Sequence, residues 1–183
     1  MSHTSVLSRM LHPTCLIALE DHYESKKVCL VESQATDSFI EIHRIPVDAF
    51  VIDLDRVFNN QLLFQGNCGE CKRADYLIIS ESAQRVLFIE MKRSNAPAQH
   101  IIHQLRGALC AFEYCQVIAR EFFQETSFLN EYQKRFISIR HTGGEKRKTQ
   151  IERTAAIGET HCAPDQPLRV SWANTIQFNK LAS

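Results

Sequence analysis

Two short apolar segments decide the fold of this chain: KRADYLIIS, residues 72–80, and RVLFIEMK, residues 85–92. Each has the apolar run of a β-strand, and the polar residues between them predict a hairpin. Because successive side chains of a strand point to opposite faces, Glu90 and Lys92 share one face with Phe88. Charge at the end of a buried row is costly unless it is paired or bound to a metal ion. The pattern therefore indicates a chemical role for these two side chains.

Asp75 stands at the start of the first strand, so the hairpin brings a second carboxylate toward Glu90 and Lys92. Two carboxylates beside a lysine suit a hard divalent cation with a reacting phosphate close by. This arrangement resembles the PD-(D/E)xK nuclease superfamily, whose signature is an acidic residue that opens one strand and Glu-x-Lys near the end of the next. Here the acidic residue is Asp75 and Glu-x-Lys is residues 90–92, with Ala74 in the place of the proline in the motif's name.

A helix is expected soon after this hairpin. Ser94 or Asn95 can cap it, and Pro97 fits its first turn. Apolar residues then recur at helical spacing and predict a stripe that packs on the sheet: Ile101, Ile102, Leu105, Ala108, Leu109 and Phe112. In the superfamily the corresponding helix often supplies a glutamine or lysine to the site, so the resemblance implies Gln104 as a further catalytic residue. The alternative for Gln104 is a polar residue on a wet helix face.

The resemblance also implies the fold class. It is an α/β domain with a central mixed sheet of about four core strands flanked by helices, as in restriction endonucleases, with elaborations at both ends of the chain. Residues 50–55 are the expected first core strand. A length of 183 residues with 44% hydrophobic content suits a single nuclease-like domain over 1–183.

The chemistry that the resemblance implies is hydrolysis of a phosphodiester by a Mg²⁺- or Mn²⁺-dependent nuclease. Asp75 and Glu90, with the main-chain carbonyl of Met91, would hold the metal, and Lys92 would orient water or stabilise charge on the phosphate. DNA is the implied substrate, with roles in DNA repair, restriction or antiviral defence. The small size suggests that a homodimer or a partner protein supplies target recognition.

Two alternatives from other functional classes remain. One is a catalytically silent subunit that keeps the nuclease fold as a binding or scaffold module of a larger complex. The other is an unrelated α/β domain in which Glu90 and Lys92 form a structural ion pair. In that second case Cys68 and Cys71 would form a small zinc or redox site.

The seven cysteines are scattered through the chain and favour reduced thiols over a disulfide framework. The spacing of Cys68-Gly69-Glu70-Cys71 is that of a metal-binding turn, but the chain has no second such pair to complete a structural zinc site. A tight glycine-containing turn is the expected structure. Without a long apolar run or a signal peptide, the sequence predicts a cytoplasmic protein with no membrane segment.

The first half of the chain gives weaker patterns. Residues 3–12 predict a short helix, residues 15–24 a helix or a strand, and residues 27–32 and 38–45 two strands. Related nucleases carry a glutamate on their first helix that can join the metal site. Glu20 is the expected candidate here, with Glu24 and Glu41 as competitors. Toward the other end, the long helix is expected to run to about Glu121, followed by a second helical piece to Gln133 and strands over 135–140 and 172–178.

The balance of 21 basic and 21 acidic residues gives no global attraction to nucleic acid. One local stretch, residues 134–153, is nevertheless strongly basic and contains the consecutive cations Lys146, Arg147 and Lys148. A solvated loop is the ordinary interpretation of such a run. Next to a phosphodiesterase site it becomes a clamp for the nucleic-acid backbone.

Reversing the charge of Lys146, Arg147 and Lys148 to glutamate is expected to weaken binding equally on unrelated DNA sequences. Consecutive cations in an extended loop point in different directions, which suits diffuse phosphate contact and not base reading. The slope of log affinity against log salt should fall by about one for each phosphate group that the protein no longer neutralises. Fluorescence anisotropy over a salt series measures this slope, and an unchanged slope would show a loop that is merely solvated.

Overall fold

The predicted hairpin forms the centre of the molecule. Strand β6 (Tyr76–Ser80) pairs antiparallel with β7 (Arg85–Lys92), with Tyr76 opposite Ile89 and Ser80 opposite Arg85. Both strands are buried along nearly their whole length. This computed structural model describes residues 2–32, 35–57, 63–92, 96–140, 150–152, 161–171 and 174–183, with side chains left out at 35–37 and 150–152.

Within the described residues, seven strands form the main sheet, in the order β1-β5-β6-β7-β8-β10-β9. Its other strands are β1 (Leu16–Ile17), β5 (Phe50–Asp53), β8 (Gln133–Arg140), β9 (Gln150–Glu152) and β10 (Leu168–Ser171). β6 pairs antiparallel with both of its neighbours, β5 and β7, whereas β7, β8 and β10 run parallel to one another. The sheet is therefore mixed, as predicted, and the α/β class is confirmed. It extends on both sides of the four core strands that the sequence predicted.

Helix α3 (Ala98–Phe123) connects β7 to the parallel strand β8. It is one continuous helix that ends at Gln124, which caps it in the left-handed conformation. The prediction of a second helical piece from Phe122 to Gln133 was wrong, because α3 continues through Phe123 and residues 124–132 form a loop and turns that lead into β8. Ser94 and Asn95, the predicted caps, lie outside the described residues.

A smaller sheet packs beneath the main one. In the described part of the chain it has the order β11-β4-β3-β2. Its strands are β2 (Glu20–His22), β3 (Ser25–Glu32), β4 (Ala35–Ile45) and β11 (Thr175–Gln177). Residues 15–24 are thus strand and turn, and the helical alternative for them is wrong. The last strand is shorter than predicted, because helix α4 (Phe178–Ala182) follows it directly.

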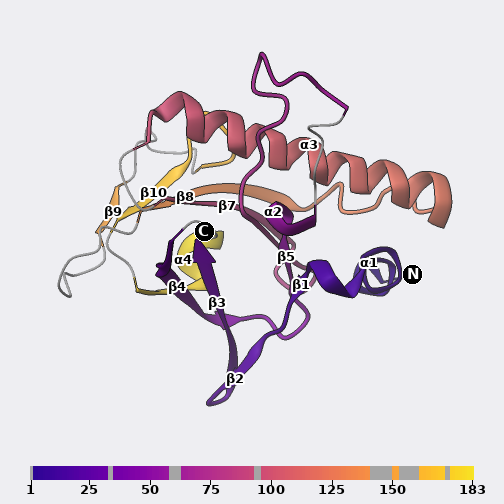
Figure 1. Cartoon of the computed structure of the whole chain (residues 1–183). Coiled ribbons are helices and arrows are strands. Elements are labelled where there is room, and N and C mark those ends of the chain that lie inside the picture. Colours follow the sequence, from indigo (N-terminus) through magenta and orange to yellow (C-terminus); the bar gives the residue numbers. More distant parts are fainter. Residues whose placement is uncertain are drawn as a thin grey trace.

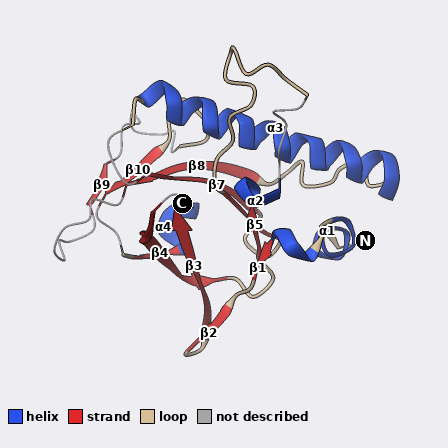
Figure 2. Ribbon diagram, viewed as in Figure 1, coloured by secondary structure: helices blue, strands red, loops and turns tan. Residues whose placement is uncertain are grey.

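The main sheet separates two hydrophobic cores, and Figures 1 and 2 show the layers. On the upper face lie α3, α1 (His3–Met10) and the short α2 (Leu54–Val57). On the lower face lie the small sheet and α4. Helices were predicted beside the sheet, but they form only one of its covering layers, and strands make up most of the other.

The alternation along β7 assigns its side chains to these two cores. Phe88 faces α3, where its ring contacts Phe112 edge-on at 5.8 Å and stacks on Phe136 at 4.6 Å. Leu87 and Ile89 point the other way, into the core shared with the small sheet. Since Glu90 lies two residues beyond Phe88, its side chain belongs to the face under α3.

The segment before β6 crosses the outside of α3, where Figure 1 shows it in magenta. The crossing is tight: a Cβ on Gly107 would overlap the main-chain carbonyl oxygen of Lys72. A second contact lies one turn earlier, where Gly69 sits in the left-handed conformation against the His103 ring. Gly107 therefore fixes the path of the chain only three residues before Asp75.

Replacing Gly107 with alanine is expected to lower the melting temperature. Alanine is normally about 1 kcal/mol better than glycine inside a helix, but here the backbone at Lys72 must move, and overpacking of this kind costs about 1–3 kcal/mol. Differential scanning calorimetry shows whether the melting temperature falls or rises. The control is Cys110→Ala, an exposed position on the same helix, which should leave the melting temperature almost unchanged. A gain in stability for Gly107→Ala would contradict the tight crossing.

Candidate functional site

The predicted residues Asp75, Glu90 and Lys92 meet at the ends of β6 and β7. The Lys92 Nζ atom lies 2.5 Å from Glu90 Oε1. The main-chain N–H of Met91 donates a hydrogen bond of 2.7 Å to Asp75 Oδ2. Asp75 thereby continues the pairing of the two strands by one side-chain hydrogen bond, which fixes its carboxylate beside the Glu-x-Lys segment.

Glu90 is fully buried, and its environment opposes ionisation. Burial raises the pKa of its carboxyl to about 8; the nearby charge of Asp75 adds to this effect, and the charge and contact of Lys92 oppose it. Burial also raises the pKa of Asp75 to about 6, although the Met91 N–H and Lys92 favour its charged form. Both carboxyl groups thus change protonation state within about one pH unit of neutrality, and such perturbed pKa values are common for groups at reactive sites.

Lys92 stays positively charged at this place. Burial lowers the pKa of its ammonium, but the charge and contact of Glu90 and the charge of Asp75 outweigh that effect, so the net pKa is raised. The side chain remains 22% exposed while Glu90 is 0% exposed. The ammonium therefore lies between a buried carboxylate and solvent.

A third carboxylate, that of Glu32, was missed by sequence reasoning. Its negative charge adds to the raised pKa of both Asp75 and Glu90, whose main cause is burial. The Glu32 Oε2 atom is buried and has no hydrogen-bond partner among the described residues. The Tyr76 hydroxyl donates a hydrogen bond to the main-chain carbonyl of Val31, which ties the end of β3 to the residue after Asp75.

The predicted upstream candidates do not reach this site. Glu20 and Glu41 lie on the small sheet, where both contact Lys27, at 3.5 and 2.6 Å. Glu24 is exposed in the turn between β2 and β3. The signal for Glu32 was present in the sequence, because it ends an apolar strand in the same way that Glu90 and Lys92 end β7. Only the pairing of distant strands brings it to the site.

Gln104 lies on the buried stripe of α3, and the alternative of a wet helix face is wrong. It precedes Phe112, which sits over Phe88, by about 12 Å along the helix axis. Helix α3 runs antiparallel to β7, so a residue earlier in the helix lies over a residue later in the strand. A shift of about 12 Å corresponds to about three or four strand residues beyond Phe88, which places Gln104 near the level of Lys92. Its Oε1 atom is buried without a hydrogen-bond partner in the described part of the chain.

The parallel strands β7 and β8 bring further polar residues to the same edge. Ser138 pairs with Glu90 and Arg140 with Lys92, so each pair shares a face of the sheet. Ligands of open α/β sheets bind outside the carboxyl ends of parallel strands. Arg140 therefore adds a second cationic residue opposite Lys92 at this edge of the sheet. The predicted nucleic-acid contacts Lys146, Arg147 and Lys148 follow it but lie outside the described residues.

The side chains present fit a magnesium or manganese ion in part. No three His, Cys, Asp or Glu side chains come together as a metal-binding group anywhere in the described ranges. Mg²⁺, however, often takes one or two carboxylates and completes its shell with water and substrate oxygens. Asp75, Glu90 and the Met91 carbonyl offer this donor set, and the buried Glu90 Oε2 has no hydrogen-bond partner among described residues.

The cysteine pair forms the expected turn. Gly69 adopts a left-handed conformation, and the Glu70 carboxylate accepts hydrogen bonds from the main-chain N–H groups of Gly66 (2.9 Å) and Cys68 (2.8 Å). Cys68 is exposed, and Cys71 is partly exposed. Backbone hydrogen bonds to Glu70 thus hold the turn.

Comparisons with protein-family models, with curated proteins and with solved structures gave no match. Among the described residues, no helix combines the length and the apolar character needed to cross a membrane.

Glu90→Gln is expected to change how stability depends on pH. A carboxyl whose pKa is raised in the folded state stabilises the fold when it is protonated, and this contribution is lost as pH rises from about 4.5 to 8. In EDTA the wild-type melting temperature should therefore fall relative to Glu90→Gln over this range. The maximum slope is about 1.4 kcal/mol per pH unit, which corresponds to roughly 3–6 °C in melting temperature for a chain of this size.

The matched control for this experiment is Glu81→Gln. Burial raises the pKa of Glu81, but hydrogen bonds from Ser2, Thr4 and His3 together outweigh it and hold the pKa at about 2. Replacing the Glu81 carboxylate should therefore shift the melting temperature by the same amount at every pH from 5 to 9. Parallel curves for wild type and Glu90→Gln would contradict the raised pKa of Glu90.

Proposed function

We propose that this chain is a metal-dependent nuclease of the PD-(D/E)xK type that hydrolyses phosphodiester bonds in DNA. The observation that carries the proposal is the meeting of Asp75, Glu90 and Lys92 at one sheet edge, with Glu90 fully buried and its Oε2 without a hydrogen-bond partner among described residues. A buried carboxylate that lacks hydrogen-bond donors is expensive unless a cation compensates it.

The order of elements supports a restriction-endonuclease-like core. A first strand, β5, precedes the strand that follows Asp75, and β7 then carries Glu90 and Lys92. Helix α3 follows and returns the chain to β8, parallel to β7. This is the sequence of strand, strand, strand, helix and strand that the resemblance implies. The small sheet and α4 belong to the elaborations around that core.

Each site residue has a role that follows from its surroundings. Asp75, Glu90 and the Met91 carbonyl would hold Mg²⁺ or Mn²⁺, which when bound activates water and neutralises charge on the phosphate. Lys92, held protonated by its carboxylate neighbours, stabilises negative charge that develops on the phosphate. Gln104 would orient water or a phosphate oxygen from α3. Glu32 increases the negative field that attracts a cation.

The Lys92–Glu90 contact also favours the alternative of a silent nuclease fold. An ammonium 2.5 Å from a buried carboxylate is itself a compensating cation. In that case the pair would serve stability, and the chain would act as a DNA-binding or scaffold subunit. A homodimer or partner protein acting in repair, restriction or antiviral defence is proposed under either function.

Asp75→Asn, Glu90→Gln and Lys92→Met are each expected to reduce cleavage of plasmid DNA by about a hundredfold or more. Activity of the wild type should require Mg²⁺ or Mn²⁺ and disappear in EDTA. Asp75→Asn and Glu90→Gln remove negative charge with little change of shape, so their melting temperatures in EDTA should stay near or above that of the wild type. Lys92→Met removes the cation beside the buried Glu90, so its melting temperature should fall.

The accompanying binding experiment measures the rise in melting temperature caused by Mn²⁺. The rise should be present in wild type and in the exposed control Glu113→Gln, and small in Asp75→Asn and Glu90→Gln. A wild-type protein that neither cleaves DNA nor gains stability from Mn²⁺ would leave the silent subunit as the better account.

A further inference from the structure

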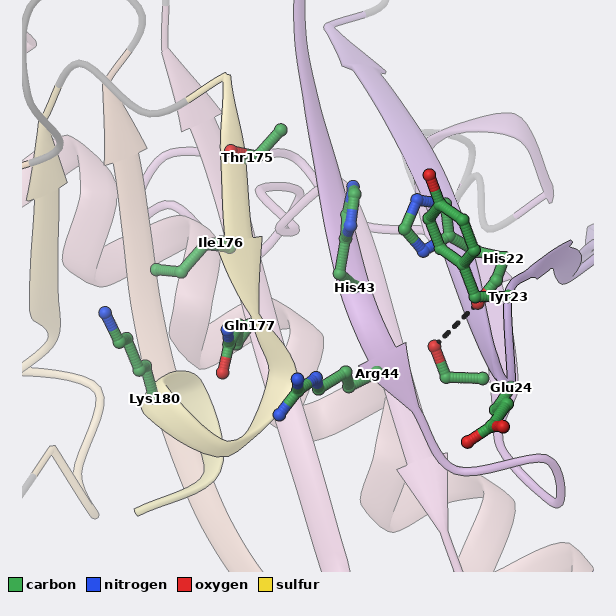
Figure 3. Close-up of a pocket in the computed structure, with 10 residues that line it drawn as sticks. His22, Tyr23, Glu24, His43, Arg44, Thr175, Ile176, Gln177 and Lys180 are labelled. Carbon is green, nitrogen blue, oxygen red and sulfur yellow. Dashed lines mark hydrogen bonds between the residues drawn. The ribbon is translucent and has the colours of Figure 1, made fainter.

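A second candidate site lies at the far end of the small sheet. It is a cavity of about 1110 Å³, and Figure 3 shows its lining. Strand β3 begins at this cavity with Ser25 and ends at Glu32 beside the candidate metal site, so the two sites are roughly 23 Å apart along the strand. The residues that line it are His22, Tyr23, Glu24, Ser25, His43, Arg44, Thr175, Ile176, Gln177 and Lys180.

A β-bulge places Arg44 in this cavity. The pairing of β3 with β4 shifts between Lys26 and Lys27, which face Ile45 and His43, so that Arg44 is the extra residue. Its φ angle is 57°, in the left-handed region that favours glycine. The bulge lets His43 and Arg44 line the same cavity, whereas neighbours in a regular strand point to opposite faces. Figure 3 shows the guanidinium extending from β4 toward Gln177.

Tyr23 is a second residue whose backbone conformation is unfavourable for its residue type. It occupies the turn between β2 and β3 with φ 53°, where glycine or asparagine is usual. The residue is 95% exposed, so packing does not explain an aromatic residue there. A large apolar ring held in an unfavourable backbone conformation at the rim of a cavity points to a role in binding.

Aromatic rings and cations line opposite parts of the cavity. The His22 ring contacts Tyr23 edge-on at 4.7 Å and His43 at 4.4 Å, which makes a short aromatic wall. Arg44 and Lys180 come from β4 and α4, and neither forms an ion pair or a side-chain hydrogen bond with another described residue. The Glu41 carboxylate, on the same strand as His43 and Arg44, contacts Lys27 and His43.

We propose that this cavity binds a nucleotide unit, with its base on the rings of Tyr23 and His22 and its phosphate at Arg44 and Lys180. Aromatic stacking combined with flexible cations is how single nucleotides and single strands are held without sequence preference. Among the described residues of the lining, Glu24 is the one carboxylate, so the cavity is cationic even with both histidines neutral. The proposal does not depend on metal chemistry at Asp75 and Glu90.

Binding is tested in EDTA, where the metal site cannot act, using fluorescein-labelled oligothymidylate and unlabelled AMP as competitor. The wild type should bind the oligonucleotide, and Tyr23→Gly, Arg44→Gly and Lys180→Ala should each weaken binding by about five- to tenfold or more. Competition by AMP would identify a free nucleotide as the natural occupant, and binding of the oligonucleotide alone would identify a single strand. Either result supports the nucleotide site.

The glycine variants separate binding from folding. Glycine fits the left-handed conformation at both positions, so Tyr23→Gly and Arg44→Gly should keep or raise the melting temperature while affinity falls. Controls are Lys26→Ala on β3 and Arg120→Ala on α3, which remove cations outside the cavity. Charge-reversed Lys146, Arg147 and Lys148 form the common background, so the basic segment does not contribute. The proposal is overturned if neither ligand binds, or if affinity is unchanged in all three cavity variants.

Discussion

The constraint on which the structure depends is that β7 is buried on both faces and still ends in two charged residues. Leu87 and Ile89 are needed below the sheet, and Phe88 is needed beneath α3. The alternation of side chains then leaves Glu90 no place except the buried face under α3. Phe88, stacked on Phe136 and touching Phe112, fixes both α3 and β8 around that strand. The same packing that holds the fold together therefore also forces a carboxylate out of water.

The chemistry of the site follows from that forced burial. A shift of the Glu90 pKa from 4.5 to about 8 corresponds to a cost on the order of 5 kcal/mol for its charged form. This is a large part of the 5–15 kcal/mol that typically stabilises a folded domain. Lys92 compensates the charge from one side, whereas Asp75 and Glu32 add negative charge from others. A site with more buried negative than positive charge attracts a cation, and it releases protons when the cation binds.

Local patterns in the sequence predicted the elements that local interactions determine. The β6–β7 hairpin, the start of α3 and the meeting of Asp75 with Glu90 and Lys92 all depend on residues close in the chain. Glu32 could not be chosen over Glu20 or Glu41, because its approach depends on Tyr76 contacting Val31 from a distant strand. The need for glycine at position 107 could not be predicted from the sequence either, because it arises from the main chain at Lys72, which crosses the helix at this point. The helical expectation for residues 15–24 failed because pairing with β3 and β5 decided their conformation.

Strand β3 connects two places where residues occupy an environment or a backbone conformation that is unfavourable for their type. Glu32 lies at one end of the strand, and Tyr23 lies next to the other end. At the first place, carboxylate oxygens of Glu32 and Glu90 are buried. At the second, Tyr23 and Arg44 adopt the left-handed conformation that favours glycine. The roughly 23 Å between them exceeds the reach of any side chain, so a phosphate held at Arg44 would not be the phosphate attacked at Lys92. A bound single strand would have to span several nucleotides, at about 3.4 Å for each in a stacked strand, to occupy both. The cavity would therefore hold and position nucleic acid, whereas the buried carboxylates at the end of β7 would determine where it is cut.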